Sequence, residues 1–402
     1  MQRALSMSRW TILASYALLA GCTQLLWLSF APVTTEAATA MHVDVGAVGD
    51  LAAIFPFVYI VLALPAGRWL DARFRPALAL GAILTGGGAL LRVVAPTSFG
   101  WQLAGQLVIA GGQPLVLNSI TKVAARYFPQ SQRATAISIG TVALFAGILA
   151  AVLTGGPLIE GGGLRLLLAV QAVVAAIGAA LVLLALRTPA AFADDPPVAL
   201  NLRWLTGDRF LWTLGGLVFI GMGTYNAVAT WLQPILAQFG QGAAAGDLIA
   251  VMTVAGILGA AVLPPAFAAR DRRRLMLLAA VGISVVVFTA ISVRQDVVWV
   301  GVWLFCEGFL LMASLPVVLD WSEVHAGPGR QGAAVGFLMM AGNLGGVMLV
   351  LVLQALIGNP RLALLALAAT GLAGLPLALR LPARARLERP SLASPPLSLD
   401  GR

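Results

Sequence analysis

The chain of 402 residues is 60% apolar and only 10% charged, and its net charge is +9. Soluble domains carry about 25% charged residues, so this composition excludes a domain that folds in water and indicates an integral membrane protein. The basic residues stand singly or in short groups between apolar runs, which favours a role in membrane topology and argues against nucleic acid as a partner.

Apolar runs of the length of a membrane span recur from one end of the chain to the other. A helix needs about 20 mainly apolar residues to cross the hydrocarbon. The sequence therefore predicts an all-α membrane protein with twelve transmembrane helices in two pseudo-symmetric bundles of six. The predicted spans are residues 10–31, 47–70, 76–95, 100–122, 132–158, 164–187, 210–239, 245–269, 275–293, 297–320, 330–357 and 361–381.

One long connection divides these spans into two groups. Residues 188–209 are rich in Pro, Asp and Ala, and they are interpreted as a cytoplasmic linker between the sixth and seventh spans. The sequence thus predicts an N-terminal six-helix bundle over residues 1–187 and a C-terminal six-helix bundle over residues 210–381. The tail, residues 382–402, is rich in Pro, Arg and Ser and is predicted to be a disordered cytoplasmic segment.

The basic residues also predict an orientation. When both termini are placed in the cytoplasm, all but four of the 25 Lys and Arg residues lie on the cytoplasmic side. This asymmetry follows the positive-inside rule and supports the helix count, because the loss of one span would scramble it. We expect a monomeric, multi-pass protein of the plasma (inner) membrane that contacts the lipid bilayer and a small-molecule substrate. The four outer residues are Arg92, Arg165, Arg294 and Arg361.

Landmark residues of the first half recur in the second half, 200 or 202 positions later. Such a repeat indicates two copies of one unit, an arrangement in which membrane transporters hold a substrate between the halves. The pairs are Pro65 and Pro265, Asp71 and Asp271, Arg73 and Arg273, Pro114 and Pro316, and Asn118 and Asp320.

The basic turn after the second span carries the first functional candidates. A carboxylate at a helix end can pair with Arg and cap the N-terminus of a neighbouring helix, and such a contact can hold one face of a transporter shut. We therefore expect Asp71, Arg73 and Arg75, with Asp271 and Arg273 in the second half, to gate the cytoplasmic face. The alternative is that these residues only fix the topology.

Glu307 is the only acidic residue deep within an apolar span. A charge at mid-membrane costs about 3 kcal/mol or more, so this side chain is expected to face a cavity or to be neutral. Three roles remain open for it: a proton carrier, a counter-charge for a cationic solute, and a structural hydrogen-bonding residue.

Polar and aromatic groups at similar depth on several spans indicate a central site. Each of them alone could serve helix packing or anchoring at the membrane interface. Together they favour a site for a small organic cation, because aromatic faces attract cations and amide oxygens accept hydrogen bonds. The substrate-binding candidates are Gln24, Trp27, Gln113, Tyr225, Asn226 and Asn343.

Sequence signals for catalysis and for bound cofactors are absent. The chain has no P-loop of the form G-x4-G-K-[S/T], so direct use of ATP is not expected. His42 and His325 lie in predicted loops and are too sparse for a metal site. We find no nucleophile–base pair either, and we expect neither an enzyme nor a cofactor.

The basic turn resembles a known signature. The pattern Gly67-x3-Asp71-x-Arg73-x-Arg75 resembles the loop motif G-x3-D-R-x-G-R of the major facilitator superfamily, with Ala and Phe in place of the motif's first Arg and second Gly. The resemblance implies the major facilitator fold, in which two six-helix bundles enclose the substrate.

Short pieces over most of the chain further resemble the feline leukaemia virus subgroup C receptor-related transporters. They include Gln24-Leu-Leu-Trp27, the end of the second span from Pro65 to Arg73, and Gln113. That family is linked to transport of choline and ethanolamine and, by an older link, to haem. The resemblance implies that Trp27 forms one wall of a cation cage and that Gln113 makes a polar contact.

Two positions depart from this second family. The segment that starts at Tyr225 is one residue longer than the family's spacing, and Asn343 stands where the family has Gln. The hypothesis is a secondary-active or facilitative transporter that moves a small organic solute by alternating access, with a choline-like cation as the first candidate. The other hypotheses are a proton-coupled exporter of drugs or metabolites and a membrane receptor that does not transport.

Overall fold

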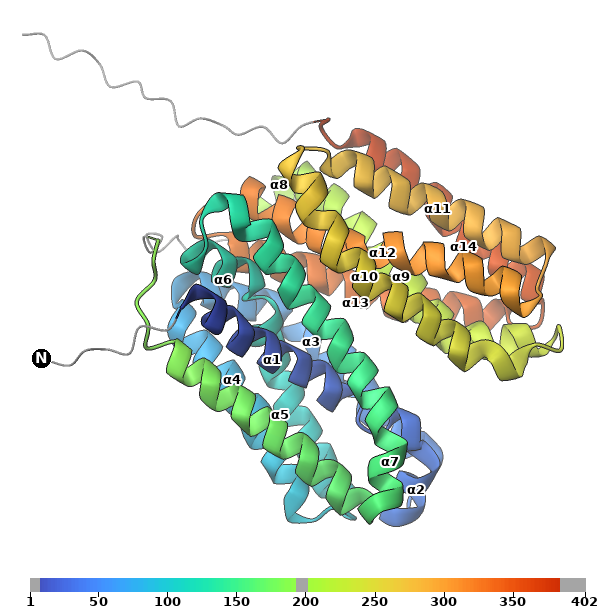
Figure 1. Ribbon diagram of the computed structural model, residues 1–402, viewed down its shortest axis with the longest axis horizontal. Coiled ribbons are helices and arrows are strands. Elements are labelled where there is room, and N and C mark those ends of the chain that lie inside the picture. The colour runs from blue at the N-terminus through green and yellow to red at the C-terminus, as the bar shows by residue number, and fades with distance from the viewer. Residues whose placement is uncertain (1–7, 193–201, 384–402) are drawn as a thin grey trace, which may run out of the picture.

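The computed structural model describes residues 8–192 and 202–383, and every regular element within these ranges is a helix (Figure 1). The first half contains α1 (Arg9–Trp27), α2 (Thr34–Met41), α3 (Val45–Ala72), α4 (Phe74–Val94), α5 (Phe99–Leu117), α6 (Ile120–Tyr127) and α7 (Gln130–Ala185). The second half contains α8 (Arg203–Gly207), α9 (Arg209–Ala237), α10 (Ala245–Ala269), α11 (Arg273–Val293), α12 (Val297–Ala326), α13 (Gln331–Leu356) and α14 (Pro360–Arg380). Part of the predicted linker, and the predicted tail from residue 384 onward, lie outside the described residues.

The number of membrane crossings follows from length and from two interruptions. Among the described residues, ten helices are long and apolar enough to span, and α5 with α6 forms one further span that is bent by 41°. At 1.5 Å per residue, the 56 residues of α7 would extend about 84 Å, far more than a bilayer core of about 30 Å. Its backbone leaves the helical region at Gly162 and Gly163, where φ is 64° at the second glycine, so α7 crosses twice. The resulting twelve crossings agree with the prediction.

Several boundaries differ from the predicted ones. α1 ends at Trp27 instead of residue 31, because Pro32 restricts the residues before it and a 3₁₀ turn, Ala31–Val33, follows. The predicted outer loop contains α2. The predicted span 100–122 breaks after Leu117, where the Asn118 side chain accepts a hydrogen bond from Tyr59 Oη (2.7 Å). α12 continues to Ala326, six residues beyond the predicted end.

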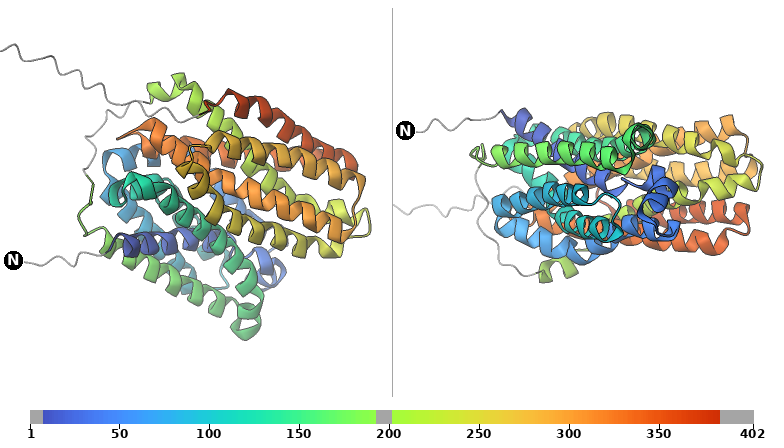
Figure 2. Two further views of the ribbon diagram at one scale, coloured as in Figure 1. Left: turned by 45° about the horizontal axis from the view of Figure 1, so that its top comes forward. Right: turned by 90° about the horizontal axis from the view of Figure 1, so that it is seen from below.

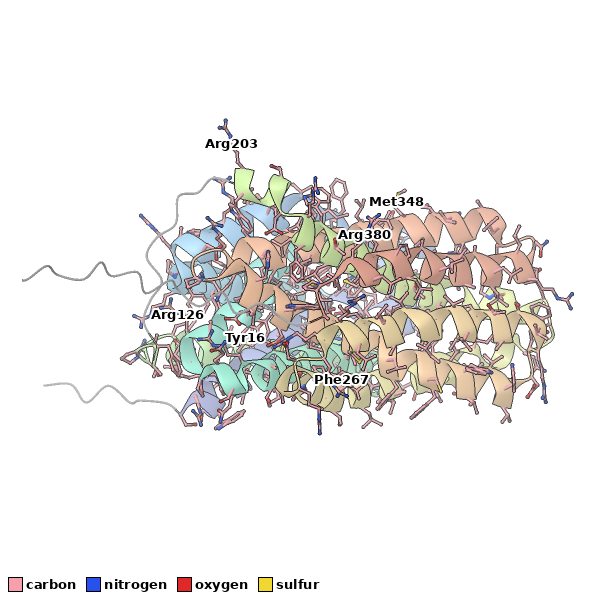
Figure 3. The ribbon with its side chains drawn as sticks, turned by 90° about the horizontal axis from the view of Figure 1, so that it is seen from above. Tyr16, Arg126, Arg203, Phe267, Met348 and Arg380 are labelled. Carbon is pink, nitrogen blue, oxygen red and sulfur yellow. The ribbon has the colours of Figure 1, made fainter. Side chains whose placement is uncertain are left out.

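The two halves converge at one end of the molecule and diverge at the other. Figures 1 and 2 show the blue-to-green half and the yellow-to-red half meeting near α6 and α8 and separating toward α2. Across the junction, α3 packs against α13 and α7 packs against α10. We call the end that holds the C-terminus of α3 and the N-terminus of α13 the closed end, and the opposite end the open end. Arg126 and Arg203 both lie at the closed end (Figure 3).

Candidate functional site

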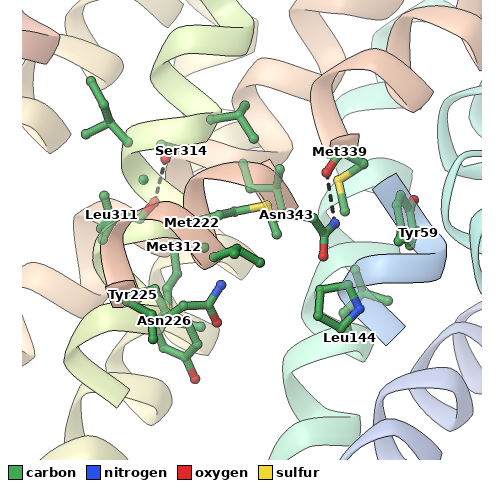
Figure 4. Close-up of a pocket in the computed structure, with 18 of the residues that line it drawn as sticks. Tyr59, Leu144, Met222, Tyr225, Asn226, Leu311, Met312, Ser314, Met339 and Asn343 are labelled. Atoms are coloured by element: carbon green, nitrogen blue, oxygen red, sulfur yellow. Dashed lines mark hydrogen bonds between the residues drawn. The ribbon is translucent and has the colours of Figure 1, made fainter. Parts of the chain in front are cut away.

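A cavity of about 580 Å³ lies between the two halves. Its walls come from α1, α3, α5 and α7 on one side and from α9, α11, α12, α13 and α14 on the other. Figure 4 shows the part of the wall that α3, α7, α9, α12 and α13 provide. Within the described part of the chain, no Asp, Glu, Lys, Arg or His lines it. The cavity is therefore an uncharged chamber with polar groups at a few points. All six substrate-binding candidates from the sequence line it: Gln24, Trp27, Gln113, Tyr225, Asn226 and Asn343.

Trp27 is held in this wall by a backbone irregularity in α3. In a regular helix the carbonyl of Ala52 would accept from the N–H of residue 56, but Pro56 has no N–H to donate. The indole Nε1 of Trp27 donates to this carbonyl oxygen at 2.9 Å. The bond fixes the ring at the last residue of α1 and ties α1 to α3 beside the cavity.

Loss of the indole N–H should therefore destabilise the protein. We expect Trp27→Phe to lower the free energy of unfolding by about 1–3 kcal/mol more than the loss of ring size alone does, because it leaves the Ala52 carbonyl without a donor. A thermal melt of the detergent-solubilised protein measures the effect. Trp231→Phe is the matched control: Trp231 Nε1 also donates to a carbonyl, that of Val350 (2.9 Å), but this carbonyl keeps the helical N–H of Gln354. Equal losses in the two variants would contradict the role given to Pro56.

The polar groups of the second half present acceptors and hydroxyls to the chamber. Asn343 Nδ2 donates to the carbonyl of Met339 at 2.8 Å, which leaves its Oδ1 pointing away from that bond (Figure 4). Tyr225 Oη lies 3.3 Å from Thr253 Oγ1, and Asn226 lies one residue further along α9. Together these side chains can accept hydrogen bonds from a solute and offer one aromatic face.

Glu307 lies one layer behind the cavity wall. It is fully buried in α12 and does not line the cavity, but Ser284 of α11 does. Ser284 Oγ lies 2.6 Å from Glu307 Oε1, so the carboxyl group is hydrogen bonded to a residue of the wall. The structure thus places Glu307 beside the chamber, from which the hydroxyl group of Ser284 separates it.

Asp71 joins the two halves at the closed end. Its Oδ1 accepts from the backbone N–H of Gly332 and its Oδ2 from that of Ala333, each at 2.8 Å. These are two of the orphan donors of the α13 N-terminus, and no side chain within the described second half caps them from the Ncap position. Lys122 Nζ lies 2.9 Å from Asp71 Oδ1, and the two side chains are 2% and 8% exposed. A carboxylate of the first half therefore caps a helix of the second.

Small residues let α3 and α13 approach closely beside this cap. A Cβ at Gly67 would overlap the carbonyl oxygen of Gly332, and a Cβ at Gly336 would overlap that of Ala63. Ala63 and Gly67 are four residues apart on α3, as are Gly332 and Gly336 on α13, which is the small-xxx-small pattern of tightly packed membrane helices. The closed end is thus sealed by backbone contact as well as by charge.

Unlike Asp71, Arg75 and Arg273 contact residues of their own half. Arg73 and Arg75 are exposed, and Arg75 Nη2 donates to the carbonyl of Thr188 at 3.4 Å. In the second half, Arg273 Nη1 lies 3.1 Å from Asp271 Oδ1 and its Nε lies 2.6 Å from Asp320 Oδ2, so this ion pair stays within one half.

A second cross-junction ion pair was not among the sequence candidates. Arg133 Nη1 of α7 lies 2.7 Å from Glu323 Oε1 of α12. Lys122, the partner of Asp71, was also missed as a site residue. Its residue type could have singled it out, because it is the single Lys among 25 basic residues. Where every other basic residue is Arg, a property of Lys other than its charge is expected to be needed at this position.

Arg92, placed among the outer loop charges by the topology analysis, is buried at the end of α4. It is 1% exposed, and its Nε and Nη1 donate to the side-chain oxygens of Gln102 and Gln106, each at 3.3 Å. Its guanidinium also lies 4.9 Å from the ring centre of Phe30. A cation at a helix C-terminus is favoured by the helix dipole, so this position suits a positive charge despite its burial.

Among the described residues, no group of three or more His, Cys, Asp or Glu side chains is arranged so that it could hold a metal ion. The chamber wall offers amide and hydroxyl oxygens but no carboxylate or imidazole. Such a wall suits an organic solute better than a transition-metal ion.

Comparison with known proteins identifies relatives over most of the chain. The family model described as Major Facilitator Superfamily matches residues 13–350. The zebrafish (Danio rerio) protein "Solute carrier family 49 member A3" is 30% identical over 374 residues, which are 87% of this chain and 78% of that protein.

Two solved structures share the fold. The human organic anion transporter MFSD10 (TETRAN) superposes with a TM-score of 0.76 at 15% identity and covers 93% of this chain and 100% of its own. A bacterial homologue of the iron transporter ferroportin in its outward-facing state superposes with a TM-score of 0.76 at 14% identity and covers 92% and 98%. At this identity the likeness concerns the fold alone. It confirms the predicted all-α architecture of two helical bundles.

Proposed function

Because the chain belongs to the major facilitator superfamily, we propose that it carries a small organic solute, with a choline-like cation as the first candidate, across the membrane by alternating access. It is a multi-pass membrane transporter and not an enzyme.

One observation carries the proposal for the solute: the chamber is uncharged and combines aromatic faces with amide oxygens. Such a wall attracts an organic cation through cation–π contacts of about 0.5–2 kcal/mol each and does not hold it by an ion pair. A volume of about 580 Å³ is typical of small-molecule sites. We assign solute contact to Trp27, Gln24, Gln113, Tyr225, Asn226 and Asn343.

The family relationship supports this choice of solute. The zebrafish relative carries the name of solute carrier family 49, to which the feline leukaemia virus subgroup C receptor-related transporters are related. Choline is therefore the first compound to test, on the strength of that resemblance and of the chamber's chemistry.

We further propose that the structure represents an outward-facing state. The closed end carries Arg126 and Arg203, and the positive-inside rule assigns such an end to the cytoplasm of the plasma (inner) membrane. Asp71 with Lys122, and Glu323 with Arg133, then hold the cytoplasmic face shut while the chamber is reached from outside. Alternating access requires these contacts to break and re-form in each cycle.

A second candidate function is proton-coupled export of a drug or metabolite. The observation that favours it is the hydrogen bond between buried Glu307 and Ser284 of the chamber wall, since a carboxyl group at this place can take up and release a proton. The two functions share the chamber and differ in the driving force.

Uptake of labelled choline by proteoliposomes that contain the purified protein tests the proposal. We expect saturable uptake that Trp27→Ala reduces at least about tenfold, because removal of the ring deletes one wall of the site. Trp101→Ala is the control, since Trp101 is 41% exposed on the outer surface of α5. Equal uptake by both variants would contradict the role of Trp27, and the absence of uptake and of competition by any amine would contradict the proposed class of solute.

A further inference from the structure

We propose that Glu307 is a proton-binding site whose protons reach the chamber through the hydroxyl group of Ser284. The inference rests on the proposed transport function, develops its proton-coupled candidate and adds the path by which the proton leaves Glu307. It concerns a pair of residues that lie on two helices of the same half, α11 and α12.

Because both side chains are buried, the carboxyl group of Glu307 has one polar contact with the chamber. Glu307 is 0% exposed, while Ser284 is 3% exposed and lines the chamber. On the side of α10, the next residue, Gly308, packs so closely that a Cβ there would overlap the carbonyl oxygen of Met252. Glu307 Oε2 has no hydrogen-bond partner among the described residues, and its Oε1 bonds only to Ser284. The serine hydroxyl is therefore the polar contact that connects this carboxyl group with the chamber.

The geometry accommodates both protonation states without moving a heavy atom. Ser284 Oγ lies 2.6 Å from Glu307 Oε1 and 3.1 Å from the carbonyl oxygen of Ala280. When Glu307 is ionised, the serine proton is donated to Oε1. When Oε1 carries a proton, it donates to Ser284 Oγ, and the serine proton is donated to the Ala280 carbonyl. One rotation of a hydroxyl group thus distinguishes the two states.

Release of the proton begins when the serine O–H rotates from the Ala280 carbonyl toward a water molecule in the chamber. Glu307 Oε1 then passes its proton to Ser284 Oγ while the serine passes its own proton to that water molecule, which leaves a carboxylate and a hydronium ion. The reverse step protonates the carboxylate again. Ser284 is unchanged after each transfer, and no other reactant is consumed.

The helices around the pair bring no compensating charge to Glu307. α13 carries no titratable side chain, and Tyr225 of α9 is hydrogen bonded to Thr253. Lys122 of α6 is paired with Asp71, and the Arg residues of α9 and α14 lie within two residues of the ends of those helices. The charged residues of α10 and α11, Asp247, Arg273 and Arg274, lie within the first three residues of those helices. The charges of α7 lie in its first turn or beside its break at Gly162. With no cation in contact among the described residues, the charge of Glu307 changes with its own proton.

Proteoliposomes loaded with a pH-sensitive dye test the path. Uptake of labelled choline and proton flux are measured together for the wild type and for the Ser284→Ala, Ser284→Thr and Glu307→Gln variants. We expect the ratio of proton flux to solute flux to fall at least tenfold in Ser284→Ala and Glu307→Gln and to be retained in Ser284→Thr, which keeps a hydroxyl group. Ser292→Ala is the control, because Ser292 lies on the same helix, outside the chamber wall, and bonds to the carbonyl of Thr289.

A second measurement needs no solute. Infrared difference spectra of the purified protein during a pH titration should show a carboxylic-acid C=O band that is absent from Glu307→Gln and displaced in Ser284→Ala. A wild-type proton-to-solute ratio in Ser284→Ala, or the lack of such a band, overturns the inference. Solute uptake without proton flux in the wild type overturns it as well but leaves the proposed transport intact, whereas failure of all uptake with the band present contradicts the proposed function instead.

Discussion

Replacement of Asp71 by Asn is expected to destabilise the closed end by about 3 kcal/mol, because it leaves Lys122 as an unpaired buried cation. The substitution also removes one of the two oxygens that cap α13. The contact forms in the conformation whose closed end is shut and breaks in the one where this end is open, so its whole free energy affects the equilibrium between the two conformations. About 1.4 kcal/mol changes their population ratio tenfold. We therefore expect a lower melting temperature in detergent and a solute uptake rate reduced at least about tenfold.

The repeat supplies the matched control for this variant. Asp271 is the sequence counterpart of Asp71, but its side chain is 37% exposed and is ion paired with Arg273 of the same half. Exposed pairs contribute about 0–1 kcal/mol, so Asp271→Asn should leave both measurements near the wild type. A double variant, Asp71→Asn with Lys122→Met, should recover part of the lost stability because it removes the orphaned charge. If Asp71→Asn and Asp271→Asn behave alike, the cross-junction cap has no role in the cycle.

Replacement of Gly67 by Val is expected to abolish transport. At this glycine the backbones of α3 and α13 touch, and a Cβ would overlap the Gly332 carbonyl oxygen. The two helices must separate to admit a larger side chain, and overpacking of this kind costs about 1–3 kcal/mol or more. The separation also pulls Asp71 away from the N-terminus of α13. Uptake should therefore fall below about one hundredth of the wild-type rate, as the closed end fails to form.

Gly87→Val separates this steric effect from the properties of valine itself. Gly87 lies within α4, and a Cβ there meets no atom within 4 Å. Both variants place a β-branched residue in a membrane helix, so a difference between them reports the contact with α13. If Gly67→Val and Gly87→Val take up solute at the same rate, close contact between α3 and α13 at Gly67 is not needed for transport.

Much of the architecture could be predicted because the bilayer imposes one-dimensional rules. A span must be apolar over about 20 residues, and this requirement located the membrane-spanning helices to within a few residues in most cases, but not the short helices α2 and α8. The errors fall where tertiary contacts override that rule. α5 breaks at Asn118 because its side chain bonds to Tyr59 and to the carbonyl of Ala63, and α12 extends to Ala326 while Glu323, in its last turn, is buried beside Arg133.

The chamber was predictable for a related reason. A polar side chain in hydrocarbon is costly unless it faces the protein interior, so amides such as Gln113 and Asn343 had to point inward. At similar depth on different helices, they meet in one cavity. Their sequence positions do not state which of them touch the solute or which are paired with each other, since those relations depend on the rotation of each helix.

The sequence by itself determined the crossings, the distribution of charge and the set of inward-facing polar residues, because each depends only on local composition and the bilayer. The tertiary structure alone decided the partners. Asp71 binds amides that lie 261 and 262 positions away, and Glu307 is separated from the chamber by Ser284. Such contacts arise from how the two halves and their helices pack, and no local pattern of residues records that packing.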